Sequence, residues 1–328
     1  MRLLGEYTLV RGTVRQDTEQ AAWDILPAEV RRAILLMPFA ERSTIEEVRL
    51  RSDTVATVTV GERERILTRD GKLLERDPLG RGIFCRAAML RQTVEKAADG
   101  FLYGAEETLK QGFITLRGGH RCGVIGQALE KNGEIAAFGS YSAICLRIAR
   151  DVEGIAAMGA DGIVDGVRVR NTLILSAPSV GKTTYLRDMV RTLARRGFRI
   201  GLCDERGELA ALRMGVPQFD LGGPVDVIGG CAKSEGMLLM LRSMSPQILA
   251  VDEITASKDV EAILQVANCG VRILATAHAD EPYAIRQRAI YAPLWQNRVF
   301  SRVLVLSRCG SSRTCAIYDA EEGGECGS

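Results

Sequence analysis

The chain has 328 residues, which is long enough for two domains that each bury a full hydrophobic core. Its 43 Lys and Arg residues nearly balance its 41 Asp and Glu residues, and the net charge of +2 excludes a global field that recruits nucleic acid or an anionic membrane. Nine cysteines without a Cys-x-x-Cys pair argue against a disulfide framework or a zinc site and favour reduced cytoplasmic thiols. We find no signal peptide and no apolar run of transmembrane length, so we expect contact with a membrane only through a partner.

The first 158 residues predict a small α+β domain. Apolar periodicity and helix-ending residues predict three helices, over Ala28–Met37, Ala87–Ala98 and Ala105–Gln111. Alternating and β-branched segments predict strands over Ile45–Arg51, Val55–Val60 and Ser142–Ile148, and a hairpin formed by Phe113–Leu116 and Cys122–Ile125. Residues 159–166 are rich in Gly and Asp and predict a linker to the second half of the chain.

Residues 167–319 predict a second domain, in which near-continuous apolar strands alternate with helices. The expected strands are Asn171–Ser176, Phe198–Cys203, Ile248–Val251 and Val271–Ala275, and the expected helices are Thr183–Arg196, Ser234–Met244 and Lys258–Asn268. Ser301–Leu306 and Thr314–Tyr318 are expected to add edge strands. This alternation is typical of an α/β fold with a parallel sheet covered by helices on both faces. Residues 320–328 are expected to form a disordered tail.

A phosphate-binding loop is the strongest functional signal in the chain. An apolar strand leads into the loop Ala-Pro-Ser-Val-Gly-Lys-Thr-Thr, and a helix follows. Backbone N–H groups and a helix N-terminus attract phosphate, Lys182 reaches the β- and γ-phosphates, and Thr183 supplies a ligand for Mg²⁺. The strand and the helix argue against a chance match on a surface turn. The expected ATP-binding residues are Ser176, Ala177, Pro178, Ser179, Val180, Gly181, Lys182, Thr183 and Thr184.

Acidic residues follow two of the predicted strands, at the edge where an open α/β sheet places its ligands. Asp252 is expected to hold Mg²⁺ through its water shell, and Glu253 to polarise the attacking water. Asp204 and Glu205 end another strand and are expected to point into the same crevice; the alternative is a surface loop paired to the arginine that follows. His278 also stands at a strand end, where it either senses the γ-phosphate or is a buried, hydrogen-bonded histidine.

Several segments resemble the stage III sporulation protein AA family. In the second half they are Asn171–Asp188, Asp204–Arg206, Ser234–Met237, Arg242–Pro246, Val251–Ile254 and Ala275–His278; in the first half they are Ile45–Leu50, Gly112–Leu116, Gly118–Arg121 and Arg147–Arg150. That family is similar to the hexameric ATPases of type II secretion and type IV pilus machines. The resemblance implies a RecA-like P-loop fold, and it implies Asp204-Glu205 as the family's aspartate box and His278 as its histidine box. It also implies a homohexameric ATPase on the cytoplasmic side of a channel between mother cell and forespore, with an integral-membrane partner.

The chain departs from the family's pattern at two positions. Ser176 replaces the first glycine of the loop, which we expect to cost about 1 kcal/mol if the position requires a glycine's backbone angles. Pro224 replaces an arginine that could contact a phosphate or a neighbouring subunit. Since the resemblance implies that the leading domain packs against a nucleotide site, we expect at least one of Arg121, Arg147 and Arg150 to reach the γ-phosphate after assembly. The alternative is that Arg121 caps an exposed hairpin and Arg147 pairs with a nearby acid.

Three functions remain open at this point. The leading one is ATP hydrolysis that moves a secretion-type channel assembly. A RecA-like nucleic-acid motor would share the ATPase half but should bring a basic track with interleaved aromatics, and the aromatic content of 5% and the near-neutral charge argue against it. The third is a nucleotide-binding scaffold without turnover, which the two departures keep open.

Overall fold

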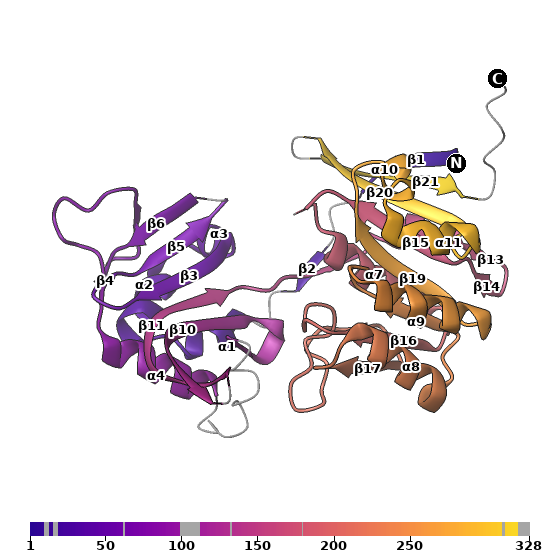
Figure 1. Ribbon diagram of the computed structural model, residues 1–328. Helices are drawn as coiled ribbons and strands as arrows, with labels where there is room; N and C mark the ends of the chain where they lie inside the picture. Colours follow the sequence, from indigo (N-terminus) through magenta and orange to yellow (C-terminus); the bar gives the residue numbers. More distant parts are fainter. Residues whose placement is uncertain are drawn as a thin grey trace. The chain divides into compact units, whose positions relative to one another are not determined.

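Two compact units make up the chain in the computed structural model, which describes residues 1–9, 13–15, 19–61, 63–98, 112–131, 133–178, 180–309 and 312–320. One unit combines Met1–Val14 with Asp151–Ser328, and we call it the split unit (Figure 1). The other is Arg15–Arg150, and we call it the inserted unit because both of its ends continue into the split unit.

The split unit is built around an eight-stranded sheet with the order β1-β21-β20-β15-β19-β18-β16-β17. Every pairing from β20 to β17 is parallel, whereas β21 runs antiparallel to β20 and β1 runs antiparallel to β21. The strands are β1 (Arg2–Thr8), β15 (Thr172–Ser176), β16 (Ile200–Asp204), β17 (Val225–Gly229), β18 (Ile248–Val251), β19 (Arg272–His278), β20 (Arg302–Cys309) and β21 (Ser312–Asp319).

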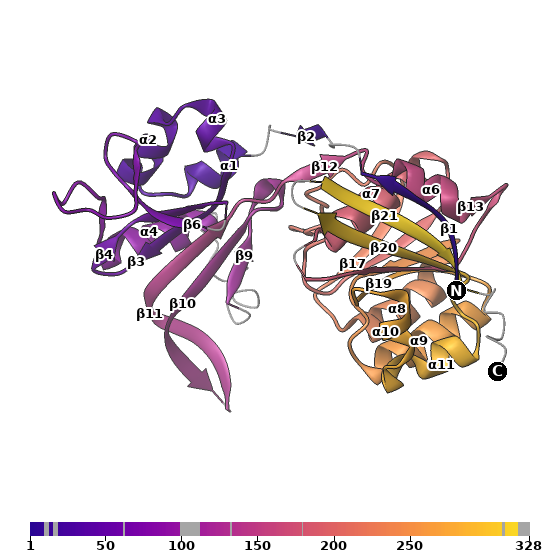
Figure 2. The ribbon, with the colours of Figure 1, turned by 90° about the horizontal axis from the view of Figure 1, so that it is seen from above.

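Helices cover both faces of this sheet, as the apolar strands predict (Figure 2). Successive residues of a strand point to opposite faces, so Ile174 of β15 joins the core cluster of α6 and α7, whereas Leu173 and Leu175 join that of α8 and α9. The helices are α6 (Ala157–Ile163), α7 (Lys182–Arg195), α8 (Lys233–Met244), α9 (Ser257–Asn268), α10 (Pro282–Arg286) and α11 (Ala292–Gln296), with a 3₁₀ turn at Ala289–Tyr291. Short ribbons pair β13 (Val164–Asp165) with β14 (Arg168–Val169) and β2 (Thr13–Arg15) with β12 (Asp151–Glu153).

The inserted unit has a seven-stranded sheet with the order β7-β6-β5-β3-β11-β10-β9, and all its pairings are antiparallel. Its strands are β3 (Ile45–Arg51), β5 (Thr57–Val60), β6 (Arg63–Leu67), β7 (Leu73–Leu74), β9 (Phe113–Thr115), β10 (Arg121–Lys131) and β11 (Glu134–Arg147), with a separate pair β4 (Thr54–Val55) and β8 (Phe84–Cys85). Its helices are α1 (Glu19–Asp24), α2 (Ala28–Leu36), α3 (Phe39–Arg42) and α4 (Ala87–Ala97), with a 3₁₀ turn at Arg117–Gly119.

The expected α/β fold is confirmed, and four expectations about organisation need correction. The expected leading domain at 1–158 is narrowed to Arg15–Arg150, because β1 completes the sheet of the split unit and residues from Asp151 onward also belong to that unit. The expected linker at 159–166 instead contains the end of α6, where Gly159, Ala160 and Ile163 are buried. Strands β20 and β21 are interior, because β1 and β17 form the edges. Ala320 is buried and donates its N–H to the carbonyl of Ser301 over 3.0 Å.

Two further expectations fall on residues that are not described: the short helix at Ala105–Gln111 and the tail at 321–328. Within the described ranges, no helix is long and apolar enough to cross a membrane. The eight cysteines in those ranges are free thiols.

Candidate active site

The phosphate-binding loop joins the carboxyl end of β15 to the amino end of α7, as the sequence predicts. Gly181 is the N-cap of α7 and has a φ of 107°, which favours glycine over any residue with a side chain. Ser176 has no positive φ, since it is the last residue of β15 and lies fully buried in strand conformation. The expected strain at Ser176 is therefore wrong: its side chain donates a hydrogen bond of 2.8 Å to the carbonyl of Ala177.

The amino group of Lys182 is buried and has no hydrogen-bond partner among the residues that the structure describes. Burial lowers the pKa of this amine, and the negative charges of Asp252 and Glu253 oppose that effect. An unpartnered buried ammonium is costly, and a phosphate placed beside it would supply the missing acceptors. The side chains therefore fit a phosphate ligand at the loop. Of the other loop residues, Val180 is buried, Ala177, Thr183 and Thr184 are half-buried, Pro178 is exposed, and Ser179 lies outside the described residues.

Two hydroxyl groups hold the carboxylate of Asp252. Thr183 donates to one oxygen over 2.9 Å and Thr276 donates to the other over 2.5 Å. The hydroxyl of Thr276 also accepts the backbone N–H of Glu253 over 2.8 Å. The expected magnesium ligands Thr183 and Asp252 therefore lie side by side, and Mg²⁺ prefers oxygen ligands of this kind. Thr276 fixes both acidic residues after β18.

Glu253 occupies a strained position and its carboxylate is engaged on both oxygens. Its φ is 49°, a left-handed value that non-glycine residues adopt at a cost. One oxygen accepts Arg206 over 2.9 Å, and the other lies 3.2 Å from Nε2 of His278. The remaining ring nitrogen of His278 is buried, and no described residue forms a hydrogen bond with it. His278 therefore contacts the expected catalytic base, and it lies beside the phosphate loop because it pairs with Ser176 in the sheet.

Asp204 has a structural task that its sequence does not reveal. Its carboxylate accepts four backbone N–H groups, those of Glu208 and Leu209 on one oxygen and those of Ala210 and Ala211 on the other, over 2.8 to 3.0 Å. A buried carboxylate with that many donors shapes its own loop. Asp204 also lines a small cavity together with Asp252 and Glu253, so it lies in the expected crevice, and its role at a metal or phosphate stays a prediction.

Glu205 does reach the crevice, but it is paired. Its carboxylate lies 3.0 Å from the ammonium of Lys233, which is buried and also donates to the backbone carbonyl of Glu253 over 2.8 Å. A cavity of about 10 Å³ is lined by Asp204, Glu205, Arg206, Glu208, Lys233, Asp252 and Glu253. Such a cavity has room for about one water molecule, between carboxylates and the cationic groups of Arg206 and Lys233.

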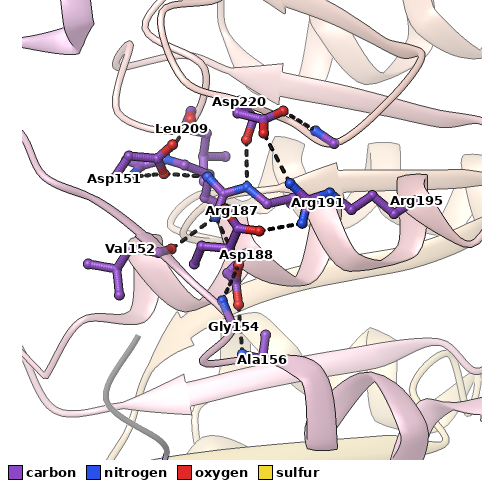
Figure 3. A network of polar contacts seen from close by, with 12 residues as sticks. Asp151, Val152, Gly154, Ala156, Arg187, Asp188, Arg191, Arg195, Leu209 and Asp220 are labelled. Atoms are coloured by element: carbon purple, nitrogen blue, oxygen red, sulfur yellow. Dashed lines mark hydrogen bonds and ion pairs between the residues drawn. The ribbon is translucent and has the colours of Figure 1, made fainter. Parts of the chain in front are cut away.

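A buried ion network anchors α7, the helix that begins at the phosphate loop (Figure 3). Arg191 donates to Asp188 over 2.9 Å, to the carbonyls of Val152 and Asp220 over 3.0 and 2.8 Å, and to the carboxylate of Asp151. Asp188 in turn accepts the backbone N–H groups of Gly154 and Ala156. These contacts tie α7 to the segment where the chain re-enters the split unit.

Arg187 connects the same helix to the loop that Asp204 folds. It donates to the carbonyls of Leu209 and Glu208 over 2.8 and 2.5 Å, and its guanidinium lies 3.6 Å from the ring centre of Phe219. Burial lowers the pKa of Arg187 to about 10, which still leaves the group charged at neutral pH, and Asp151 opposes this effect. The helix and the loop are therefore held as one piece.

The three arginines expected to serve a γ-phosphate lie in the inserted unit, each with partners inside that unit. The guanidinium carbon of Arg121 lies 3.6 Å from the ring centre of Phe113. Arg147 donates a hydrogen bond of 2.9 Å to the carboxylate of Glu47, and Arg150 donates one of 2.8 Å to the carbonyl of Ser43. Their role at a nucleotide stays a prediction. In the split unit, Pro224 directly precedes β17. It lies where the parallel strands begin, because Val225 pairs with Ile200 and Gly229 with Asp204. An arginine at 224 would therefore lie at the amino ends of the strands, whereas the phosphate loop of the same chain lies at their carboxyl ends.

Three further residues complete the site without being predicted as part of it: Thr276, Arg206 and Lys233. Thr276 stands two residues before His278, so its position at a strand end was a usable signal. Arg206 was considered only as a partner of the acidic pair before it, whereas it pairs with Glu253. Nothing in the local sequence marks Lys233 as buried, because its partners are Glu205, Glu253, Thr255 and Asp259.

Comparisons with known proteins agree with this geometry. A sequence model of the family described as "Sporulation stage III, protein AA" matches residues 16–325. Stage III sporulation protein AA of Bacillus subtilis (strain 168) is 33% identical over 306 residues, which cover 91% of this chain and 94% of the relative.

Solved structures resemble most of the chain at low sequence identity. The pilus retraction motor PilT with bound ADP has a TM-score of 0.56 and 14% identity and covers 85% of this chain and 80% of its own. The ATPase DotB of Yersinia pseudotuberculosis has a TM-score of 0.56 and 10% identity, covering 96% and 85%. At such identities the likeness shows the fold alone, which is RecA-like. The match over nearly the full length shows that the chain belongs to the sporulation stage III protein AA family.

Proposed function

We propose that the protein binds and hydrolyses ATP with Mg²⁺ and works as a homo-oligomer, a hexamer, that moves a secretion-type assembly between mother cell and forespore. The observation that carries the proposal is the buried, unpartnered ammonium of Lys182 at a helix N-terminus whose N-cap is glycine. Fold likeness to PilT with bound ADP and to the ATPase DotB supports it. Family membership supports the place in sporulation.

The side chains divide the work between binding and proton transfer. Lys182 would bind the β- and γ-phosphates, and Thr183 and Asp252 would hold Mg²⁺, which neutralises phosphate charge when bound. Glu253 would accept a proton from the attacking water, for which it must first be released by Arg206 or His278. Glu205 and His278 would adjust the charge around that water. Because both oxygens of Glu253 are engaged, the structure fits a resting state.

That engagement also favours a second candidate, a nucleotide-binding scaffold without turnover. A scaffold would bind ATP and keep Glu253 tied to Arg206 and His278. Any turnover by the purified protein that Glu253→Gln removes would exclude the scaffold.

The test is Lys182→Ala in the full chain. We expect at least 10²-fold lower turnover, because the change removes a charge-assisted contact to the phosphates. Lys258→Ala is a matched control, since Lys258 is an exposed lysine of the same unit. Hydrolysis by Lys182→Ala at the rate of the parent and the control would refute the ATPase assignment.

Assembly and partners are part of the same proposal. Turnover that rises with subunit concentration would support the oligomer. If one of Arg121, Arg147 and Arg150 serves the γ-phosphate, its alanine variant should lose turnover only in the assembled state.

If the protein has an integral-membrane partner, we expect it to sediment with membranes only when channel components are present. No stimulation of turnover by DNA is expected.

A further inference from the structure

Arg313 lies against the phosphate loop, although it comes from the last strand described. A Cβ built on Gly181 would lie 3.6 Å from Nη1 and 3.8 Å from Cζ of Arg313. Gly181 is the N-cap of α7 and directly precedes Lys182. The guanidinium therefore lies beside the helix N-terminus that the proposed function assigns to phosphate.

Strand alternation explains why Arg313 reaches this place. Cys315 and Ile317 follow it at intervals of two along β21 and belong to the core cluster packed with α7, so Arg313 is on the same face of the sheet. Arg308 of β20 is its direct cross-strand partner and shares that face. Unlike Cys315 and Ile317, Arg313 is exposed, because it stands near the end of β21 that borders the phosphate loop.

Positive charge is concentrated around the N-terminus of α7 and the neighbouring end of β21. The N-terminus of α7 carries a partial positive charge, and the unpartnered ammonium of Lys182 belongs to its first turn. Arg308 and Arg313 are directly opposite each other in the antiparallel pair, which places two guanidinium groups near each other there. No ion pair of Arg313 occurs among the residues that the structure describes. A polyphosphate bound in the loop would place negative charge beside the N-terminus of α7, Lys182 and Arg313.

We propose that Arg313 binds the phosphate chain of a nucleoside di- or triphosphate held by the phosphate loop of the same chain. The proposal rests on the proposed function and adds to it a binding residue from the C-terminal hairpin. The planar guanidinium presents paired donors that match phosphate oxygens, which a single ammonium does not. The site would then hold an arginine of its own chain, independent of any arginine from the inserted unit.

The experiment compares ADP affinities of full-length variants by titration calorimetry. Arg313→Ala should raise the Kd for ADP about 10-fold or more, since a charge-assisted contact is lost. Arg313→Lys should lie between this variant and the parent, because it keeps the charge but loses the fork. Arg168→Ala is the matched control. Arg168 is an exposed arginine near the amino end of β15, whereas the phosphate loop follows the carboxyl end of that strand.

The controls separate failure of this inference from failure of the proposed function. If the parent binds no ADP, or if Lys182→Ala binds as tightly as the parent, the proposed function is refuted. If Lys182→Ala loses binding while Arg313→Ala stays within about twofold of the parent, only the role of Arg313 is refuted. Thermal unfolding without nucleotide should give Arg313→Ala the midpoint of the parent, because the side chain is exposed.

A second titration identifies the part of the ligand that Arg313 contacts. Inorganic tripolyphosphate has neither base nor ribose, and Arg313→Ala should weaken its binding by about the same factor as that of ADP, on the order of 10-fold. A loss for ADP with no loss for tripolyphosphate would assign Arg313 to the nucleoside and overturn the phosphate contact. A loss that disappears below the assembly concentration would overturn the claim that the contact is within one chain.

Discussion

Two acidic pairs at the same sheet edge have the same residues and different tasks. Asp204-Glu205 ends β16 and Asp252-Glu253 follows its neighbour β18, so both stand at the carboxyl ends of adjacent parallel strands. The carboxylate of Asp204 accepts four backbone N–H groups of its own loop. The carboxylate of Asp252 instead accepts two side-chain hydroxyls, one of which belongs to the phosphate loop. The donors around a carboxylate, and not its position on the sheet, decide whether it can serve a ligand.

The largest expected difference between the two pairs is in turnover. Glu253→Gln should bind ATP like the parent and hydrolyse it about 10² to 10⁴ times more slowly, because an amide cannot accept the proton of water. Glu205→Gln should keep most of the activity, since its carboxylate mainly faces Lys233. Steady-state hydrolysis and ATP affinity of both variants check this. Normal turnover by Glu253→Gln together with loss by Glu205→Gln would show that the two glutamates have exchanged roles.

The two aspartates should differ in stability. Asp204→Ala leaves four backbone donors, three of them buried, without an acceptor and should lower the free energy of unfolding by about 3 kcal/mol or more. Asp252→Ala removes an acceptor from two hydroxyls and should cost less stability, while Mg²⁺-dependent ATP binding is lost. Urea unfolding and nucleotide titration with and without Mg²⁺ measure both effects. Equal losses of stability would remove the proposed distinction.

A smaller effect is expected at Thr276, which has no counterpart at the first pair. Thr276→Val keeps the shape but loses the donor to Asp252 and the acceptor for Glu253, and we expect Mg²⁺ to bind about 10-fold more weakly in the ATP complex. Thr276→Ser retains the hydroxyl and is the control. The affinity is read from ATP binding at increasing Mg²⁺. If valine and serine variants bind alike, the hydroxyl does not orient the metal ligand.

The smallest expected effect is a pH dependence from Lys182, which faces the second pair. Burial lowers its pKa below the usual 10.5. Nucleotide affinity should therefore fall about a few-fold as the pH rises toward the usual value of 10.5, because the ammonium loses its proton before a free lysine does. The unfolded chain keeps that proton longer, so the lysine's contribution to the stability of the free protein rises over the same interval. ADP titrations across this range should show the decline, and Lys182→Arg should bind with little pH dependence.

The phosphate loop and the elements around it were predictable because their signals are local. Asn171–Thr184 places an apolar strand, a loop and a helix in sequence, and the structure has β15, the loop and α7 there. The apolar runs at Ile248–Val251 and Val271–Ala275 likewise became β18 and β19. Periodicity and turn chemistry suffice for such elements.

The partners of the acidic residues were not predictable, because they come from distant parts of the chain. Arg206 meets Glu253, and Lys233 meets Glu205, through the order of strands in the sheet. Arg313 reaches Gly181 because β21 turns back along β20, and nothing near residue 313 in the sequence indicates this. Strand β1 was missed for the same reason, since its sheet partner β21 lies at the other end of the chain.

The pairing of β1 with β21 has a consequence for how the protein is made. Synthesis proceeds from the N-terminal side, so β1 leaves the ribosome before the inserted unit and long before its partner β21. Contacts of such long sequence separation form slowly, because a large loop must close first. β1 must therefore stay unpaired until the inserted unit and most of the split unit have appeared. A fragment that starts at Asp151 would lack β1 and expose the edge of β21, which is a template for aggregation. Expression of the second half alone should thus yield insoluble protein, unless a peptide with the sequence of β1 is supplied.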